Sequence, residues 1–113
     1  MKSNVHDVDL CGKTIRLSWI DGPTKDKTHE HVFHADGTVE WYEQGAARLQ
    51  LGEGERPRFA QEAVADGIAL VSYHSQSGYT LTAVLNFIDR SVIGVASSDQ
   101  VWVPVHGSLE VVR

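Results

Sequence analysis

Cysteine and long apolar runs are scarce in this chain, and each scarcity excludes a class of protein. The single cysteine, Cys11, cannot form a disulfide within the chain, so the sequence predicts a protein of a reducing compartment. No apolar stretch approaches the ~20 residues of a membrane-spanning helix. The start, Met1 to Asp9, lacks the apolar segment of a secretory signal. We therefore expect a cytoplasmic protein with no membrane partner.

Positive charge is scarce as well, with 10 Lys and Arg against 15 Asp and Glu and a formal net charge of -5. Nucleic-acid-binding domains need a basic surface, so a nucleic-acid partner is not expected. The glycine patterns of phosphate-binding loops and the Gly-x-Ser-x-Gly turn of serine hydrolases are also absent from the sequence. We expect no cofactor.

Short strand patterns separated by turn residues fill most of the chain. Polar and apolar residues alternate from Thr14 to Trp19, the period of a half-buried strand. Asp36-Gly37 and Asp66-Gly67 have the chemistry of hairpin turns. The expected strands are 14–19, 28–33, 38–42, 59–64, 68–74, 79–87, 91–97 and 108–112, with 101–104 as a short edge piece and 45–51 as either a strand or a helical turn.

This pattern predicts an all-β fold, an antiparallel up-and-down barrel of about eight strands. Closure would remove the unpaired edges of so apolar a sheet and leave room for one small ligand. A chain of 113 residues with 42% hydrophobic residues suits one domain with one core. We expect residues 1–9 to form a flexible tail and residues 10–113 the barrel.

Several short blocks carry a family resemblance. They are Gly12–Lys13, Trp19–Pro23, Asp36–Trp41, Ser72–Tyr73, Gly78–Leu81 and Leu85–Phe87. Together they resemble the calycin-type domains of the molybdenum cofactor biosynthesis protein F group, over residues 10–112. The resemblance implies a lipocalin-like barrel with a central cavity.

A more distant similarity is to the phenolic acid decarboxylases, which share the barrel type. Leu17 and Trp19 stand where those enzymes carry two tyrosines that hold a substrate carboxylate. Their catalytic arginine and glutamate fall near Tyr42 and Ser75. This resemblance therefore implies a pocket with more apolar walls and speaks against decarboxylation.

The first functional hypothesis is a binding module for a small, partly apolar or aromatic molecule. Leu17, Trp19 and Tyr73 would form its walls, and Glu40, Tyr42 and His31 would be polar anchors. Asn86, between two apolar residues, is either a buried amide that orients the ligand or a turn hydrogen bond. The sequence does not identify the ligand.

The second hypothesis is an enzyme that acts on a small, possibly aromatic acid in the same lumen. An inward Glu40 would be a desolvated carboxylate with a raised pKa, and His31 across the hairpin would be its partner in acid-base chemistry. The alternative is that Glu40 faces solvent while Val39 and Trp41 pack in the core. Aromatic residues on both faces of this strand leave the choice open.

Two further patterns concern metal and assembly. His29 and His31 share one face of a strand, but no third ligand follows at a telling interval, so we predict no metal site. Between Ser91 and Val103 aliphatic residues occupy both faces, and one interior cannot cover both. A two-fold homodimer would cover the outer face.

Overall fold

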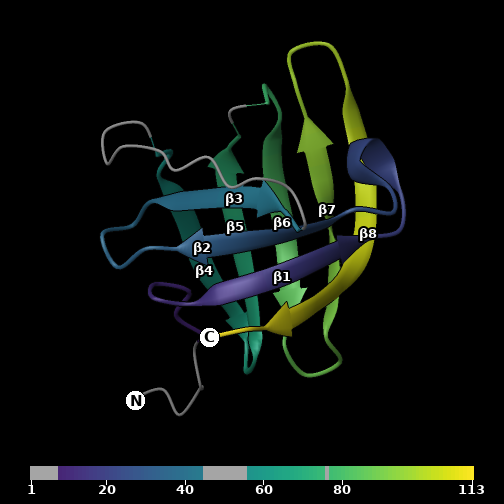
Figure 1. Ribbon diagram of the computed structural model, residues 1–113. Coiled ribbons are helices and arrows are strands. Elements are labelled where there is room, and N and C mark those ends of the chain that lie inside the picture. The colour runs from purple at the N-terminus through teal and green to yellow at the C-terminus, as the bar shows by residue number, and fades with distance from the viewer. Residues whose placement is uncertain (1–7, 45–55, 76) are drawn as a thin grey trace.

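The computed structural model describes residues 8–44, 56–75 and 77–113, which form an almost entirely β structure (Figure 1). Its strands are β1 (Thr14–Trp19), β2 (Thr28–Phe33), β3 (Val39–Glu43), β4 (Phe59–Ala65), β5 (Ile68–His74), β6 (Thr80–Asn86), β7 (Ser91–Ser97) and β8 (Trp102–Val111). One short 3-10 helix, η1 (Gly22–Thr24), follows β1. The predicted all-β fold is confirmed, whereas the element expected at 45–51 lies outside the described residues. None of the helices in the described part of the chain has the length and apolarity to cross a membrane.

All eight strands belong to one antiparallel sheet, in the order β3-β2-β1-β8-β7-β6-β5-β4. This is the strand order of an up-and-down barrel whose ladder is interrupted between β3 and β4. Within the described residues a single bridge, Thr38 with Arg58, joins the two sides of that gap. The predicted antiparallel up-and-down arrangement of eight strands is confirmed, and the sheet curls into a half-barrel. In Figure 1, β1 to β3 cross in front of β4 to β7, and β8 curves between the two groups.

The alternation predicted from the sequence decides which side chains face the inside of the curl. Along β1, Ile15, Leu17 and Trp19 are buried, whereas the residues between them are only half-buried. Along β2, the buried positions are His29, His31 and Phe33. The two strands pair antiparallel, so these inward side chains share one surface. Polar histidines thus enter the interior through the same periodicity that buries the aliphatic core.

Strand β8 is longer than the sequence predicted, because Pro104 does not interrupt it. Its pairing with β7 covers residues 102–108, and its pairing with β1 covers residues 107–111. Pro104 therefore has a strand partner on one side only, where a missing N–H is tolerated. At Gly107 the two pairings overlap, and a Cβ there would lie 2.2 Å from the Ser18 carbonyl oxygen. Glycine at this position lets β8 approach β1 closely at the point where the sheet curls.

Candidate ligand cavity

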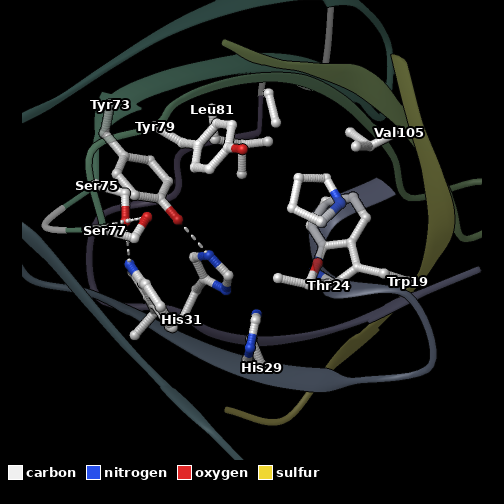
Figure 2. A pocket seen from close by; sticks show the side chains of 13 residues that line it. Trp19, Thr24, His29, His31, Tyr73, Ser75, Ser77, Tyr79, Leu81 and Val105 are labelled. Atoms are coloured by element: carbon white, nitrogen blue, oxygen red, sulfur yellow. Dashed lines mark hydrogen bonds between the residues drawn. The ribbon is translucent and has the colours of Figure 1, made fainter. Parts of the chain in front are cut away.

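The curled sheet surrounds a cavity of about 260 Å³ (Figure 2). Every strand except β4 contributes to its lining, together with η1 and the loop after β5. The lining residues are Trp19, Pro23, Thr24, His29, His31, Trp41, Tyr73, Ser75, Ser77, Tyr79, Leu81, Ala96 and Val105. None of these described lining residues is an Asp, Glu, Lys or Arg. A concave site with aromatic walls and a few polar groups is typical of pockets for small molecules.

His31 and Tyr73 form the polar centre of the lining. The His31 Nε2 atom lies 2.6 Å from the Tyr73 hydroxyl oxygen, and both side chains are buried. Burial, together with a smaller contribution from the nearby His29 ring, lowers the pKa of His31 to about 3. Burial also raises the pKa of Tyr73. Both groups are therefore neutral at pH 7, and the contact is a hydrogen bond between uncharged partners.

An aromatic layer extends from this pair toward β3. The His29 and Trp41 ring centroids lie 4.7 Å apart, and burial lowers the pKa of His29, so its imidazole is also neutral at pH 7. Trp41 Nε1 donates a hydrogen bond of 3.1 Å to Ser75 Oγ, and Ser75 Oγ lies 2.9 Å from Ser77 Oγ. This chain of contacts connects β3 to the loop after β5 across the gap in the ladder.

Helix η1 supplies Pro23 and Thr24 and is fixed to β8 by the residue that precedes it. Asp21 accepts hydrogen bonds of 2.7 Å from the backbone N–H and from Nδ1 of His106. The His106 contacts lower the pKa of Asp21. Gly22 follows with φ +81, and a Cβ there would lie 2.5 Å from Val105 Cγ1. A glycine is needed for η1 to pack this closely against the cavity wall.

Three residues predicted to bind the ligand are brought together in the lining: Trp19, His31 and Tyr73. Leu17, the predicted third wall residue, is on the same face of β1 as Trp19 but belongs to the packed core and is 2% exposed. It supports the cavity from behind and is not among the lining residues. The shared inward face of His29 and His31 is confirmed, since both line the cavity.

Glu40 and Tyr42 do not line the cavity, which corrects their predicted role as polar anchors. Trp41 takes the inward position on β3, so its two neighbours project from the other face of the sheet. Glu40 Oε1 accepts a hydrogen bond of 2.9 Å from His34 Nε2, not from His31 as expected. The acid-base hypothesis therefore has no carboxylate among the described lining residues.

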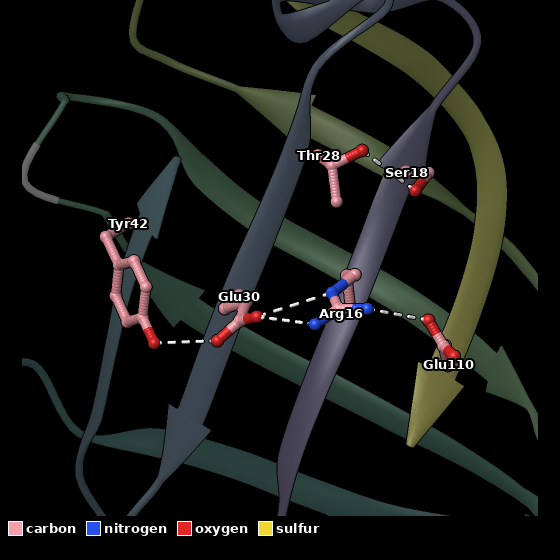
Figure 3. A network of polar contacts seen from close by, with 6 residues as sticks. All are labelled: Arg16, Ser18, Thr28, Glu30, Tyr42 and Glu110. Carbon is pink, nitrogen blue, oxygen red and sulfur yellow. Dashed lines mark hydrogen bonds and ion pairs between the residues drawn. The ribbon is translucent and has the colours of Figure 1, made fainter. Parts of the chain in front are cut away.

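On that outer face Tyr42 belongs to a polar network (Figure 3). Its hydroxyl donates to Glu30 Oε1 at 2.7 Å, and Glu30 Oε2 pairs with Arg16 at 2.8 Å. Arg16 also contacts Glu110 on β8 at 3.0 Å. These contacts join β3, β2, β1 and β8 side by side, so Tyr42 has a structural role in the sheet.

Asn86 also lies outside the cavity lining. Its Oδ1 accepts hydrogen bonds from the backbone N–H groups of Ile88 and Asp89, at 2.9 and 3.2 Å. Of the two alternatives for Asn86, the structure shows the turn hydrogen bond, in the connection between β6 and β7. Within the described residues, no group of three His, Cys, Asp or Glu converges on a possible metal position.

Sequence reasoning did not single out several lining residues. Pro23 and Thr24 come from the single turn of η1, and Ser75 and Ser77 come from the loop after β5, where no periodicity indicates a facing direction. Ala96 and Val105 are small residues on long strands and carry no chemical signal. The hairpin alternation of β2 was the one signal that pointed to the histidines.

Comparisons with known proteins support the fold and supply no family. No protein-family model and no curated protein sequence matches the chain. Among solved structures, the chain is similar to a Burkholderia vietnamiensis protein described as a "putative beta-lactamase", with a TM-score of 0.70 and 14% sequence identity. The similarity covers 94% of this chain and 98% of that one. At this identity the likeness shows that the two share a fold.

Proposed function

We propose that the protein is a small-molecule-binding barrel that holds one small, uncharged, mostly aromatic ligand in its cavity. The observation that carries the proposal is the lining: aromatic and aliphatic walls around a few buried polar atoms, with no charged Asp, Glu, Lys or Arg among the described members. The resemblance to the calycin-type molybdenum cofactor biosynthesis protein F group supports the same function, because calycin barrels hold ligands in the lumen. We further propose a cytoplasmic location and a homodimeric state.

The description of the structural neighbour does not extend to this chain. A serine β-lactamase needs a base beside its nucleophile, and a zinc enzyme needs a cluster of ligands. The lining serines, Ser75 and Ser77, contact each other, and Ser75 accepts the Trp41 N–H. No Lys or Glu stands among the described lining residues. Binding without turnover is the function that this chemistry supports.

The test is a titration with toluene and acetophenone, followed by backbone amide NMR shifts. We expect shifts at the lining residues of β1, β2, β5 and β6. An Ala96→Phe variant would fill the cavity and abolish these shifts. The matched control is Ala60→Phe, at an exposed position on β4, which would leave them unchanged. Absence of shifts for both compounds at millimolar concentration would contradict the proposal.

A further inference from the structure

One buried polar atom of the cavity lining has no hydrogen-bond partner. Among the buried side-chain nitrogen and oxygen atoms of the described residues, this distinction belongs to His31 Nδ1 alone. Figure 2 shows the His31 ring inside the cavity, with one nitrogen directed at Tyr73 and the other on the opposite side. The His29 backbone raises the pKa of His31, the smallest of the three influences on that pKa, but it forms no hydrogen bond of acceptable geometry with Nδ1. Buried polar groups are normally paired, so an orphaned one in a pocket needs an explanation.

The Tyr73 contact decides which form of the imidazole is present. If Nε2 carried the proton and donated it to Tyr73, two groups would stay unpaired: the buried Tyr73 O–H and the Nδ1 lone pair. If Tyr73 donates to Nε2, only the Nδ1 N–H stays unpaired. Each unmet buried group destabilises the fold, so the second arrangement is favoured. His31 therefore presents its Nδ1–H as a donor, and a ligand that pairs with it must supply a hydrogen-bond acceptor.

The neighbouring ring of His29 lies beside His31 in the cavity lining. The centroids of the two imidazole rings lie 6.5 Å apart. His29 precedes His31 by two residues in β2, so both side chains project from the same face of the strand. No hydrogen bond holds the His29 side chain within the described structure, and its closest ring contact is the tilted one with Trp41. A ligand reaches the buried His31 Nδ1–H only if a neighbouring side chain moves, and a rotation of His29 would break no hydrogen bond of the described structure.

We propose that the ligand is an uncharged aromatic carbonyl compound, whose oxygen accepts a hydrogen bond from His31 Nδ1 while its ring packs among Trp19, Trp41 and Tyr79. This inference rests on the proposed function and names the ligand class of the same cavity. A neutral carbonyl fits the donor, and the aromatic walls fit the rest of the molecule. A carboxylate would enter a buried site with no cation among its described lining residues, which costs free energy. Tyr73 is a positioning residue in this arrangement, since it fixes the proton on the far nitrogen of His31.

The experiment compares acetophenone with α-methylstyrene, a molecule of the same shape that carries C=CH2 in place of C=O. We expect acetophenone to bind the wild-type protein about tenfold more tightly, a factor that corresponds to about 1.4 kcal/mol. In His31→Phe the preference would disappear while α-methylstyrene still binds. Benzoate at pH 7 would bind more weakly than acetophenone. Equal binding of the matched pair would overturn the carbonyl assignment and leave the proposed function standing. Tighter binding of benzoate would overturn both, because benzoate is charged at pH 7. Binding of none of the three would overturn both.

A second measurement keeps the inference testable if His31→Phe does not fold. The imidazole nitrogen shifts of the wild-type protein report the tautomer directly. We expect the Nδ1–H form in the free protein, and a downfield shift of that proton with acetophenone but not with α-methylstyrene. In Tyr73→Phe the tautomer would no longer be fixed, and the preference for acetophenone would fall. A wild-type protein in the Nε2–H form would overturn the inference.

Discussion

His31 and Tyr73 are 42 residues apart in the sequence, yet His31 Nε2 and the Tyr73 hydroxyl oxygen are joined at 2.6 Å inside the half-barrel. The contact connects β2 to β5, two strands that are not neighbours in the sheet. It therefore crosses the interior from one wall to the other. A single hydrogen bond here both stabilises the curl and sets the proton position that faces the cavity.

Removal of the Tyr73 hydroxyl should destabilise the protein. Tyr73→Phe keeps the ring and leaves His31 Nε2 buried without a partner, so we expect the free energy of unfolding to fall by about 1–3 kcal/mol. Urea unfolding followed by Trp fluorescence measures the change. Tyr79→Phe is the matched control, because no hydrogen bond of the Tyr79 hydroxyl occurs in the described structure, and its change should stay below about 0.5 kcal/mol. Equal losses in the two variants would show that the bond contributes nothing.

Acid should weaken the fold through His31. Its pKa in the folded protein is about 3, against 6.5 for the ordinary side chain, and burial also lowers the pKa of His29. As the pH falls, the unfolded chain therefore binds the proton before the folded protein does. The contribution of neutral His31 to the free energy of unfolding is fully present above about pH 6.5 and declines as the pH falls toward about 3. Each such group contributes a slope of up to about 1.4 kcal/mol per pH unit.

The measurement is the pH dependence of urea unfolding between pH 4 and pH 7, in the wild-type protein and in His31→Gln. The variant should show a shallower slope over this interval, whatever its absolute stability. Carboxylates contribute to both proteins alike, and His74→Gln, at an exposed position, is the control that should keep the wild-type slope. Parallel curves for the wild-type protein and His31→Gln would argue against a buried neutral histidine.

Gly107→Ala should disturb the crossing of β8 and β1. The added Cβ would lie 2.2 Å from the Ser18 carbonyl oxygen and 3.2 Å from Trp19 Cα, both backbone atoms that cannot move independently. We expect a loss of about 1–3 kcal/mol, the usual cost of overpacking. Ser108→Ala, at the next, exposed position of β8, should change stability by less than about 0.5 kcal/mol. The midpoints of thermal unfolding of the two variants measure these changes. An unchanged midpoint for Gly107→Ala would contradict the close approach of β8 to β1.

The homodimer remains a prediction, and the structure indicates which exposed apolar residues its interface would cover. Ile93 on β7 and Trp102 on β8 are 53% and 68% exposed on the outer face of the sheet. The chain has a mass of 12.5 kDa, so light scattering after gel filtration at micromolar concentration should give about twice that value. Ile93→Lys should reduce it to the mass of one chain, whereas Val64→Lys on β4 should not. A single-chain mass for the wild-type protein would refute the dimer.

The sequence by itself determined the strands and the composition of the interior. Alternation from Thr14 to Trp19 and from Thr28 to Phe33 gave the inward positions of both strands, because side chains of a strand change face at every residue. Turn chemistry at Asp36-Gly37 and Asp66-Gly67 placed two of the hairpins. Alternation and turn chemistry are local properties, so a short stretch of sequence is enough to encode them.

Only the tertiary structure decided which polar residues meet in the cavity. Aromatic residues on both faces of β3 made Trp41 and Tyr42 equivalent in the sequence, and the inward position of Trp41 placed Glu40 and Tyr42 on the outer face. The partnership of His31 with Tyr73 depends on the curl that brings β2 over β5. The interrupted ladder between β3 and β4 depends on long-range pairing in the same way. Such relationships arise from the packing of distant strands, which no short stretch of sequence encodes.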